Sequence, residues 1–136
     1  MAYELRVNTG MIKVPVLDED GEELGFIRFN PTDADLVKRY REVGEYFKNL
    51  ADIDEENRDV DALIAISDGV KEKLDYLFNS NVSETLFLKC SPLSPMEDGS
   101  IYLFVVMEAI EGLVSQVMDD RIAKLKKVEE ATKEYN

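Results

Sequence analysis

The spacing of apolar residues in the last third of the chain constrains the fold more strongly than any other feature. From about Ser100 onward, apolar side chains recur every three or four residues, which places them on one side of an α-helix. They are Leu103, Met107, Ile110, Val114 and Val117, prolonged with a slight drift by Met118, Ile122, Leu125 and Val128. The sequence therefore predicts one long C-terminal helix.

A second amphipathic pattern follows the segment FNPTDADL. Its apolar residues alternate at spacings of four and three: Leu36, Tyr40, Val43, Phe47 and Leu50. Two starts of this helix are open, either Asn30 as N-cap with Pro31 at the first helical position or Thr32 as N-cap. Both leave acidic residues at the positive end of the helix dipole. We expect Tyr40 and Phe47 to belong to the core.

A third helix is predicted to end near Asn79. Its apolar positions are Val60, Leu63, Val70, Leu74 and Leu77. The pair Asp68-Gly69 lies inside this pattern and predicts a kink or a split. The following SNVSETLFLKC predicts a short helix capped by Asn81 or Ser83.

The segment CSPLSPMEDG is the clearest break in the chain, because two prolines and a glycine do not continue regular structure. Within it, Ser94 and Glu97 have the spacing of a capping box, with Pro95 at the first helical position.

The N-terminal part predicts a β-hairpin. Two β-rich segments, Ile12–Leu17 and Leu24–Phe29, flank a DEDGEE sequence whose Asp-Gly pair is a strong turn signal. Pro15 predicts an edge strand, and Tyr3–Val7 alternates in a way that allows a third strand. A hairpin by itself is marginal in water, so we expect it to pack on the helices or to gain strands.

Five of the six residues from Asp18 to Glu23 are carboxylates, which raises the question of a calcium loop. An EF-hand loop needs glycine at its sixth position and glutamate at its twelfth. Counted from Asp18, Gly21 is fourth and Phe29 is twelfth, so the pattern fails and predicts a turn. The acidic run from Asp52 to Asp59 fails the same test, and a solvated helix N-terminus explains it.

The residue types present disfavour an enzyme. The chain has no histidine and one cysteine, Cys90, so His-dependent nucleophiles, disulfides within the chain and Cys-based zinc sites are excluded. Cys90 is expected to be a packing thiol. The acidic pairs of the last helix, Glu108 with Glu111 and Asp119 with Asp120, lack a partner base and are expected on a solvated face. We predict no catalytic residue, cofactor or metal.

Length and charge predict one acidic domain. The 136 residues carry a net charge of −13, which argues against nucleic acid or an anionic membrane as a partner. No apolar run is long enough to span a bilayer, so a cytoplasmic protein is expected. The predicted class is mainly α, a domain of three to four helices, with residues 1–30 as hairpin region, 31–118 as helical core and 119–136 as an amphipathic C-terminal tail.

The tail supplies the candidate binding residues. They are Met118, Ile122, Leu125 and Val128. The earlier turns of the helix suffice to cover the core, so these side chains predict contact with a partner helix or with a second copy of the chain. Fraying at the chain end is the competing interpretation.

Three segments occur in a recognisable order: FNPTDADLVKRY after the hairpin, KLDYLFNSN, and ETLFLKCSPLSPMEDGSIYLF before the final helix. Over residues 12–118 the chain thereby resembles the tail assembly chaperones of siphophages and prophages of Gram-positive bacteria. The resemblance implies a helical, non-enzymatic protein of the host cytoplasm that tends to oligomerise. It also implies that the protein binds the tape-measure protein before tail-tube subunits polymerise around it. It carries no defined set of functional residues.

The expected function is therefore to bind and solubilise the tape-measure protein, with the tail-tube protein as a further candidate partner. The alternatives are a structural head–tail connector or minor tail protein, and a small acidic adaptor or regulatory protein. A carboxylate-dependent metalloenzyme is the least favoured alternative.

Overall fold

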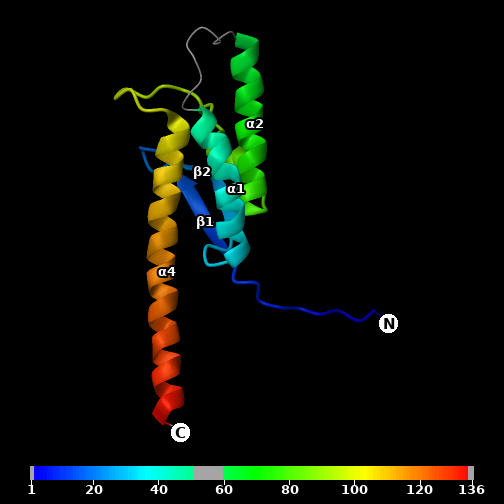
Figure 1. Cartoon of the computed structure of the whole chain (residues 1–136), viewed down its shortest axis with the longest axis vertical. Coiled ribbons are helices and arrows are strands. Elements are labelled where there is room, and N and C mark those ends of the chain that lie inside the picture. The colour runs from blue at the N-terminus through cyan, green and yellow to red at the C-terminus, as the bar shows by residue number, and fades with distance from the viewer. Residues whose placement is uncertain (1, 51–59, 135–136) are drawn as a thin grey trace.

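The chain folds into a hairpin and helices, with one helix far longer than the rest. The computed structural model describes residues 2–50 and 60–134. The elements are β1 (Ile12–Leu17), β2 (Glu23–Phe29), α1 (Ala34–Leu50), α2 (Val60–Phe78), α3 (Ser83–Leu86) and α4 (Tyr102–Glu134). The mainly α class, the hairpin and the long C-terminal helix are thus confirmed. Helices α1 and α2 lie side by side, the hairpin lies behind α1 and α4 in the view of Figure 1, and α4 extends well beyond this body.

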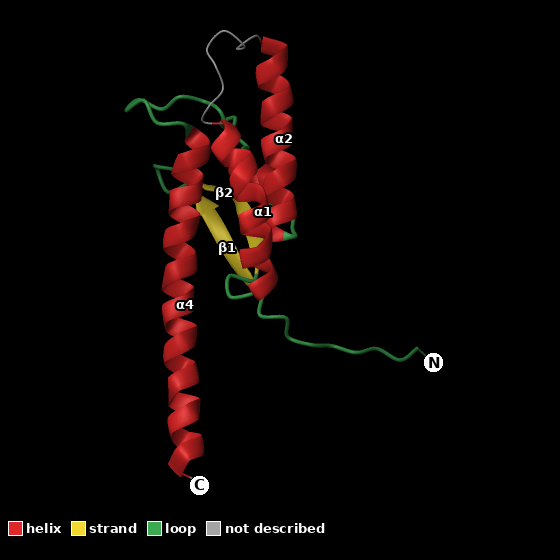
Figure 2. Cartoon of the chain, in the orientation of Figure 1, coloured by secondary structure: helices red, strands yellow, loops and turns green. Residues whose placement is uncertain are grey.

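The hairpin forms as predicted. Strands β1 and β2 pair antiparallel (Figure 2), with Ile12 opposite Phe29. The Asp18 carboxylate closes the turn, because its Oδ1 accepts the backbone N–H groups of Asp20 and Glu22, each at 2.9 Å. Gly21 has a φ of +81°, which glycine adopts without steric cost.

The predicted third strand over Tyr3–Val7 is wrong. The described sheet has two strands, and Tyr3 is almost fully exposed. Alternation indicates only that a segment suits a half-buried sheet surface. Here the segment leads away from the body instead of along a strand edge (Figure 1).

A single core joins the hairpin to all four helices. Phe29 packs edge-to-face on Phe78, with ring centroids 5.0 Å apart. The buried apolar side chains are Ile27, Phe29, Leu36, Val43, Phe47, Val70, Leu74, Leu77, Phe78, Val82, Leu86, Phe87, Leu103, Val106, Met107 and Ile110. The hairpin is therefore stabilised by packing one face on the helices, as a two-stranded sheet requires.

Both predicted starts of α1 are wrong. The helix begins at Ala34, and Asp33 is its N-cap, with Oδ1 accepting the backbone N–H of Asp35 at 3.0 Å. The side chains of Asn30 and Thr32 are instead engaged with Arg121 of α4. Asn30 and Thr32, the two N-caps that local sequence favours, thus bind a residue at least 89 positions away in the chain.

Helix α2 runs through Asp68-Gly69, so the predicted split is wrong. The hydroxyl of Tyr46 from α1 lies where a Cβ on residue 69 would project. The glycine therefore permits close packing of α1 on α2 and does not break the helix.

Neither predicted cap of α3 occupies the N-cap position, although Asn81 Oδ1 accepts the backbone N–H of Glu84 at 3.5 Å. Its N-cap is Val82, and the capping carboxylate comes from α2, because Asp75 Oδ1 accepts the N–H groups of Val82 and Ser83 at 2.8 Å each. No helix starts at Pro95, which instead forms an isolated bridge with Ile101 just before α4. The capping-box spacing there belongs to a turn.

Candidate partner-binding groove

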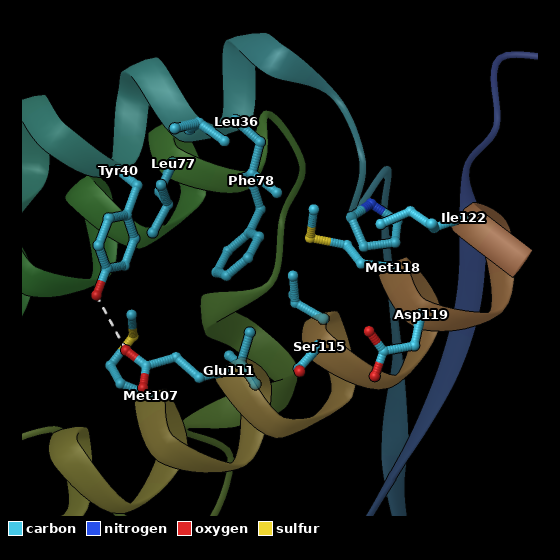
Figure 3. A pocket seen from close by; sticks show the side chains of 14 residues that line it. Leu36, Tyr40, Leu77, Phe78, Met107, Glu111, Ser115, Met118, Asp119 and Ile122 are labelled. Atoms are coloured by element: carbon cyan, nitrogen blue, oxygen red, sulfur yellow. Dashed lines mark hydrogen bonds between the residues drawn. The ribbon is translucent and has the colours of Figure 1, made fainter.

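An apolar groove of about 380 Å³ lies between the first turns of α1 and the middle of α4 (Figure 3). Its apolar lining comes from α1 and the loop before it, from the end of α2, and from α4. These residues are Pro31, Leu36, Val37, Tyr40, Leu77, Phe78, Met107, Ile110, Val114, Met118 and Ile122. The groove is thus built by three segments that are distant in sequence.

The groove has a buried floor and an open rim. Leu36, Phe78 and Met107 are buried and form the floor. Val37 and Met118 are about half exposed and lie on opposite sides, on α1 and α4. An apolar surface that is open in this way suits the side chains of a partner segment.

A hydrogen bond crosses the groove at one end. The Tyr40 hydroxyl donates to Glu111 Oε1 at 2.9 Å and links α1 to α4 (Figure 3). This bond, with a smaller contribution from burial, raises the pKa of Tyr40 above its ordinary value. Tyr40 is half exposed, so its prediction as a core residue is wrong: its ring borders the groove while its hydroxyl reaches Glu111.

The polar residues of the rim are acidic or neutral. Glu111, Ser115 and Asp119 lie on successive turns of α4 and are exposed. The groove therefore offers a partner an apolar interior and negative charge along one edge.

The predicted binding residues divide into two pairs. Met118 and Ile122 line the groove, whereas Leu125 and Val128 lie beyond it on the projecting part of α4. Their exposed fractions rise along the helix, from 39% for Met118 and 45% for Ile122 to 56% for Leu125 and 61% for Val128. We call these four side chains the apolar stripe; it continues the groove along one helix.

Arg121 fixes the point at which α4 leaves the body. Its Nη1 donates to Asn30 Oδ1 at 3.0 Å and to Thr32 Oγ1 at 2.6 Å, and its Nη2 donates to the Gly10 carbonyl at 2.7 Å. In the sequence this arginine is one basic residue of the tail among several. Its three acceptors lie some 90 to 110 positions away, and no local signal indicates them.

A second hollow, of about 760 Å³, lies between the hairpin and the start of α4. Its lining is more polar and includes Lys89, which reaches Asp18 at 3.4 Å and Glu22 at 3.8 Å. These ion pairs occupy Lys89, the one cation of that lining, and its surface is less apolar than the groove between α1 and α4. The groove is therefore the stronger candidate for binding an apolar partner segment.

The remaining candidates from the sequence are the acidic clusters and Cys90. Residues 2–50 and 60–134 contain no cluster of three acidic or cysteine side chains suited to a metal ion. Cys90 is half-buried, with its thiol 3.7 Å from the Ser91 carbonyl. The acidic run from Asp52 to Asp59 lies outside the described residues. Across the described helices, none has the length and apolar composition that a membrane span requires.

Comparison of the chain with protein-family models, with curated proteins and with solved structures finds no match.

Proposed function

We propose that this protein is a chaperone of phage tail assembly, which binds and solubilises an apolar helical part of the tape-measure protein. One observation carries the proposal: the groove between α1 and α4 continues without interruption into the apolar stripe. Together they offer a partner one apolar track along a single helix.

The spacing of the stripe suits a helical partner. Met118, Ile122 and Leu125 are separated by four and three residues, the spacing with which one helix packs against another. An amphipathic helix that lies in an apolar groove is a common mode of peptide recognition. The same spacing would suit repeated heptads of a long helical client.

Charge favours a particular kind of client and helps to keep the complex in solution. The rim carboxylates of Glu111 and Asp119 favour a client whose apolar face is flanked by lysine or arginine. The lining of the groove contains two of the chain's 29 acidic residues, Glu111 and Asp119, so most of the negative charge lies elsewhere and opposes aggregation of the covered client.

The experiment is a pull-down of the tagged protein from host cells that produce the phage, with two matched variants. Leu125→Asp places a charge on the stripe. Leu88→Asp places the same charge at a leucine of equal exposure, 58% against 56%, on another part of the surface. We expect wild type and Leu88→Asp to recover the tape-measure protein and Leu125→Asp to lose it, since a buried unpaired carboxylate is costly.

Two other results contradict the proposal. Recovery of portal or tube proteins, with this chain present in mature particles, would make it a structural component. Recovery of a host enzyme or toxin without the tape-measure protein would make it an adaptor.

A further inference from the structure

Charge is divided sharply along α4. Acidic residues precede the point at which the helix leaves the body, among them Glu108, Glu111, Asp119 and Asp120. Residues 121–136 contain five basic and three acidic side chains, a net charge of +2, which leaves −15 on residues 1–120 of a chain whose total is −13. The projecting tail thus carries a net positive charge, whereas residues 1–120 taken together are strongly negative.

We propose that the occupant of the groove in the absence of a client is the α4 tail of a second copy, packed antiparallel in a two-fold dimer. Each basic tail then lies along the acid-edged groove of the other copy. This inference concerns the purified chain and holds whatever its physiological client is.

The two surfaces match in length. The part of α4 that lines the groove runs from Met107 to Ile122, about 22 Å at 1.5 Å per residue. The tail from Ile122 to Glu134 is about 18 Å long by the same rise. An antiparallel pair whose two-fold axis passes between residues 122 and 123 therefore lays each tail within the groove, with Leu125 of one copy near Met118 of the other.

The same arrangement pairs opposite charges. Asp119 and Lys126 are seven residues apart, so they lie on one flank of the helix, about 20° from each other. In the antiparallel pair, residue 119 of one copy faces residue 126 of the other, and the two-fold axis repeats the contact. A parallel pair aligns acidic with acidic and basic with basic segments, which like-charge repulsion disfavours.

The dimer also accounts for the exposure of both the apolar stripe and the groove. The stripe and the groove are exposed in the single chain, and one antiparallel contact covers both. Because a client and the second copy would use the same surface, self-association and client binding compete.

Sedimentation equilibrium of the full chain, with no client present, tests the dimer through a charge swap. Asp119→Lys and Lys126→Asp each place like charges opposite each other twice, and we expect each to raise the dimer dissociation constant by at least about tenfold. An equimolar mixture of the two variants restores opposite charges at both contacts and should associate at least as tightly as wild type. That recovery also shows that both variants are folded.

Lys127→Asp is the matched control. It makes the same charge change one residue away, about 180° from Met118 on the helix, and it should shift the dissociation constant by less than about threefold. A wild-type chain that stays monomeric at millimolar concentration would overturn the inference. So would equal effects of Lys126→Asp and Lys127→Asp, or a mixture that associates no better than its components.

Discussion

The two halves of α4 carry similar apolar patterns but have opposite environments. Leu103 near the start of the helix is 1% exposed, whereas Leu125 in the projecting half is 56% exposed. Leucines in the same helix, at positions that repeat every three or four residues, thus serve as core in one half and as open surface in the other. Periodicity specifies which face of a helix is apolar, but not whether anything covers that face.

Neighbouring segments account for the difference. The first half of α4 is tied to the loop before it, because the Leu103 N–H donates to the Pro92 carbonyl at 2.8 Å. It is also tied to α3, because the Tyr102 hydroxyl donates to the Leu86 carbonyl at 2.8 Å. In the described part of the chain, Arg121 makes the last side-chain hydrogen bonds from α4 to the body.

The largest expected effect comes from truncating the two leucines in parallel. Leu103→Ala leaves a cavity in the core and should lower the free energy of unfolding by about 2–5 kcal/mol. Leu125→Ala should change it by no more than about 0.5 kcal/mol, because its side chain has no core to leave. Urea unfolding followed by circular dichroism measures both, at a dilution where the chain is monomeric. Comparable losses in the two variants would contradict the contrast between the halves.

A smaller loss of stability is expected at Arg121, where α4 leaves the body. Arg121→Ala removes a charged donor from Asn30 Oδ1, Thr32 Oγ1 and the Gly10 carbonyl, and should cost about 1–3 kcal/mol. The same unfolding experiment measures the loss.

Lys124→Ala removes a tail cation that makes none of these bonds and is the control for Arg121→Ala. Equal losses in the two variants would show that net charge, not the three hydrogen bonds, accounts for the effect.

The smallest expected effect lies between the halves, at Gly112. A Cβ at this position meets no atom within 4 Å, so Gly112→Ala should stabilise α4 by about 0.5–1 kcal/mol through helix propensity. Gly69→Ala is the opposite case, because its Cβ would meet the Tyr46 hydroxyl and should destabilise the chain. A stabilising Gly69→Ala would mean that α1 and α2 are not packed as closely as described. Thermal unfolding of both variants decides the signs.

Local sequence determined the features that depend on near neighbours. The Asp-Gly pair and the flanking β-branched residues determined a hairpin that begins at Ile12 and ends at Phe29. The spacing of apolar residues determined the existence and the apolar face of α1, α2 and α4. Turn chemistry and helical periodicity act over a few residues, so a single sequence contains them.

Tertiary structure decided the features that depend on residues far apart in the chain. Asp75 caps α3, and Tyr46 occupies the space beside Gly69. Arg121 donates hydrogen bonds to the side chains of Asn30 and Thr32, which local rules assign as caps of α1. The groove likewise exists only where α1, α2 and α4 meet. Each of these features arises from side chains that packing alone brings together, and this is why the sequence indicated the apolar stripe but not the groove that continues it.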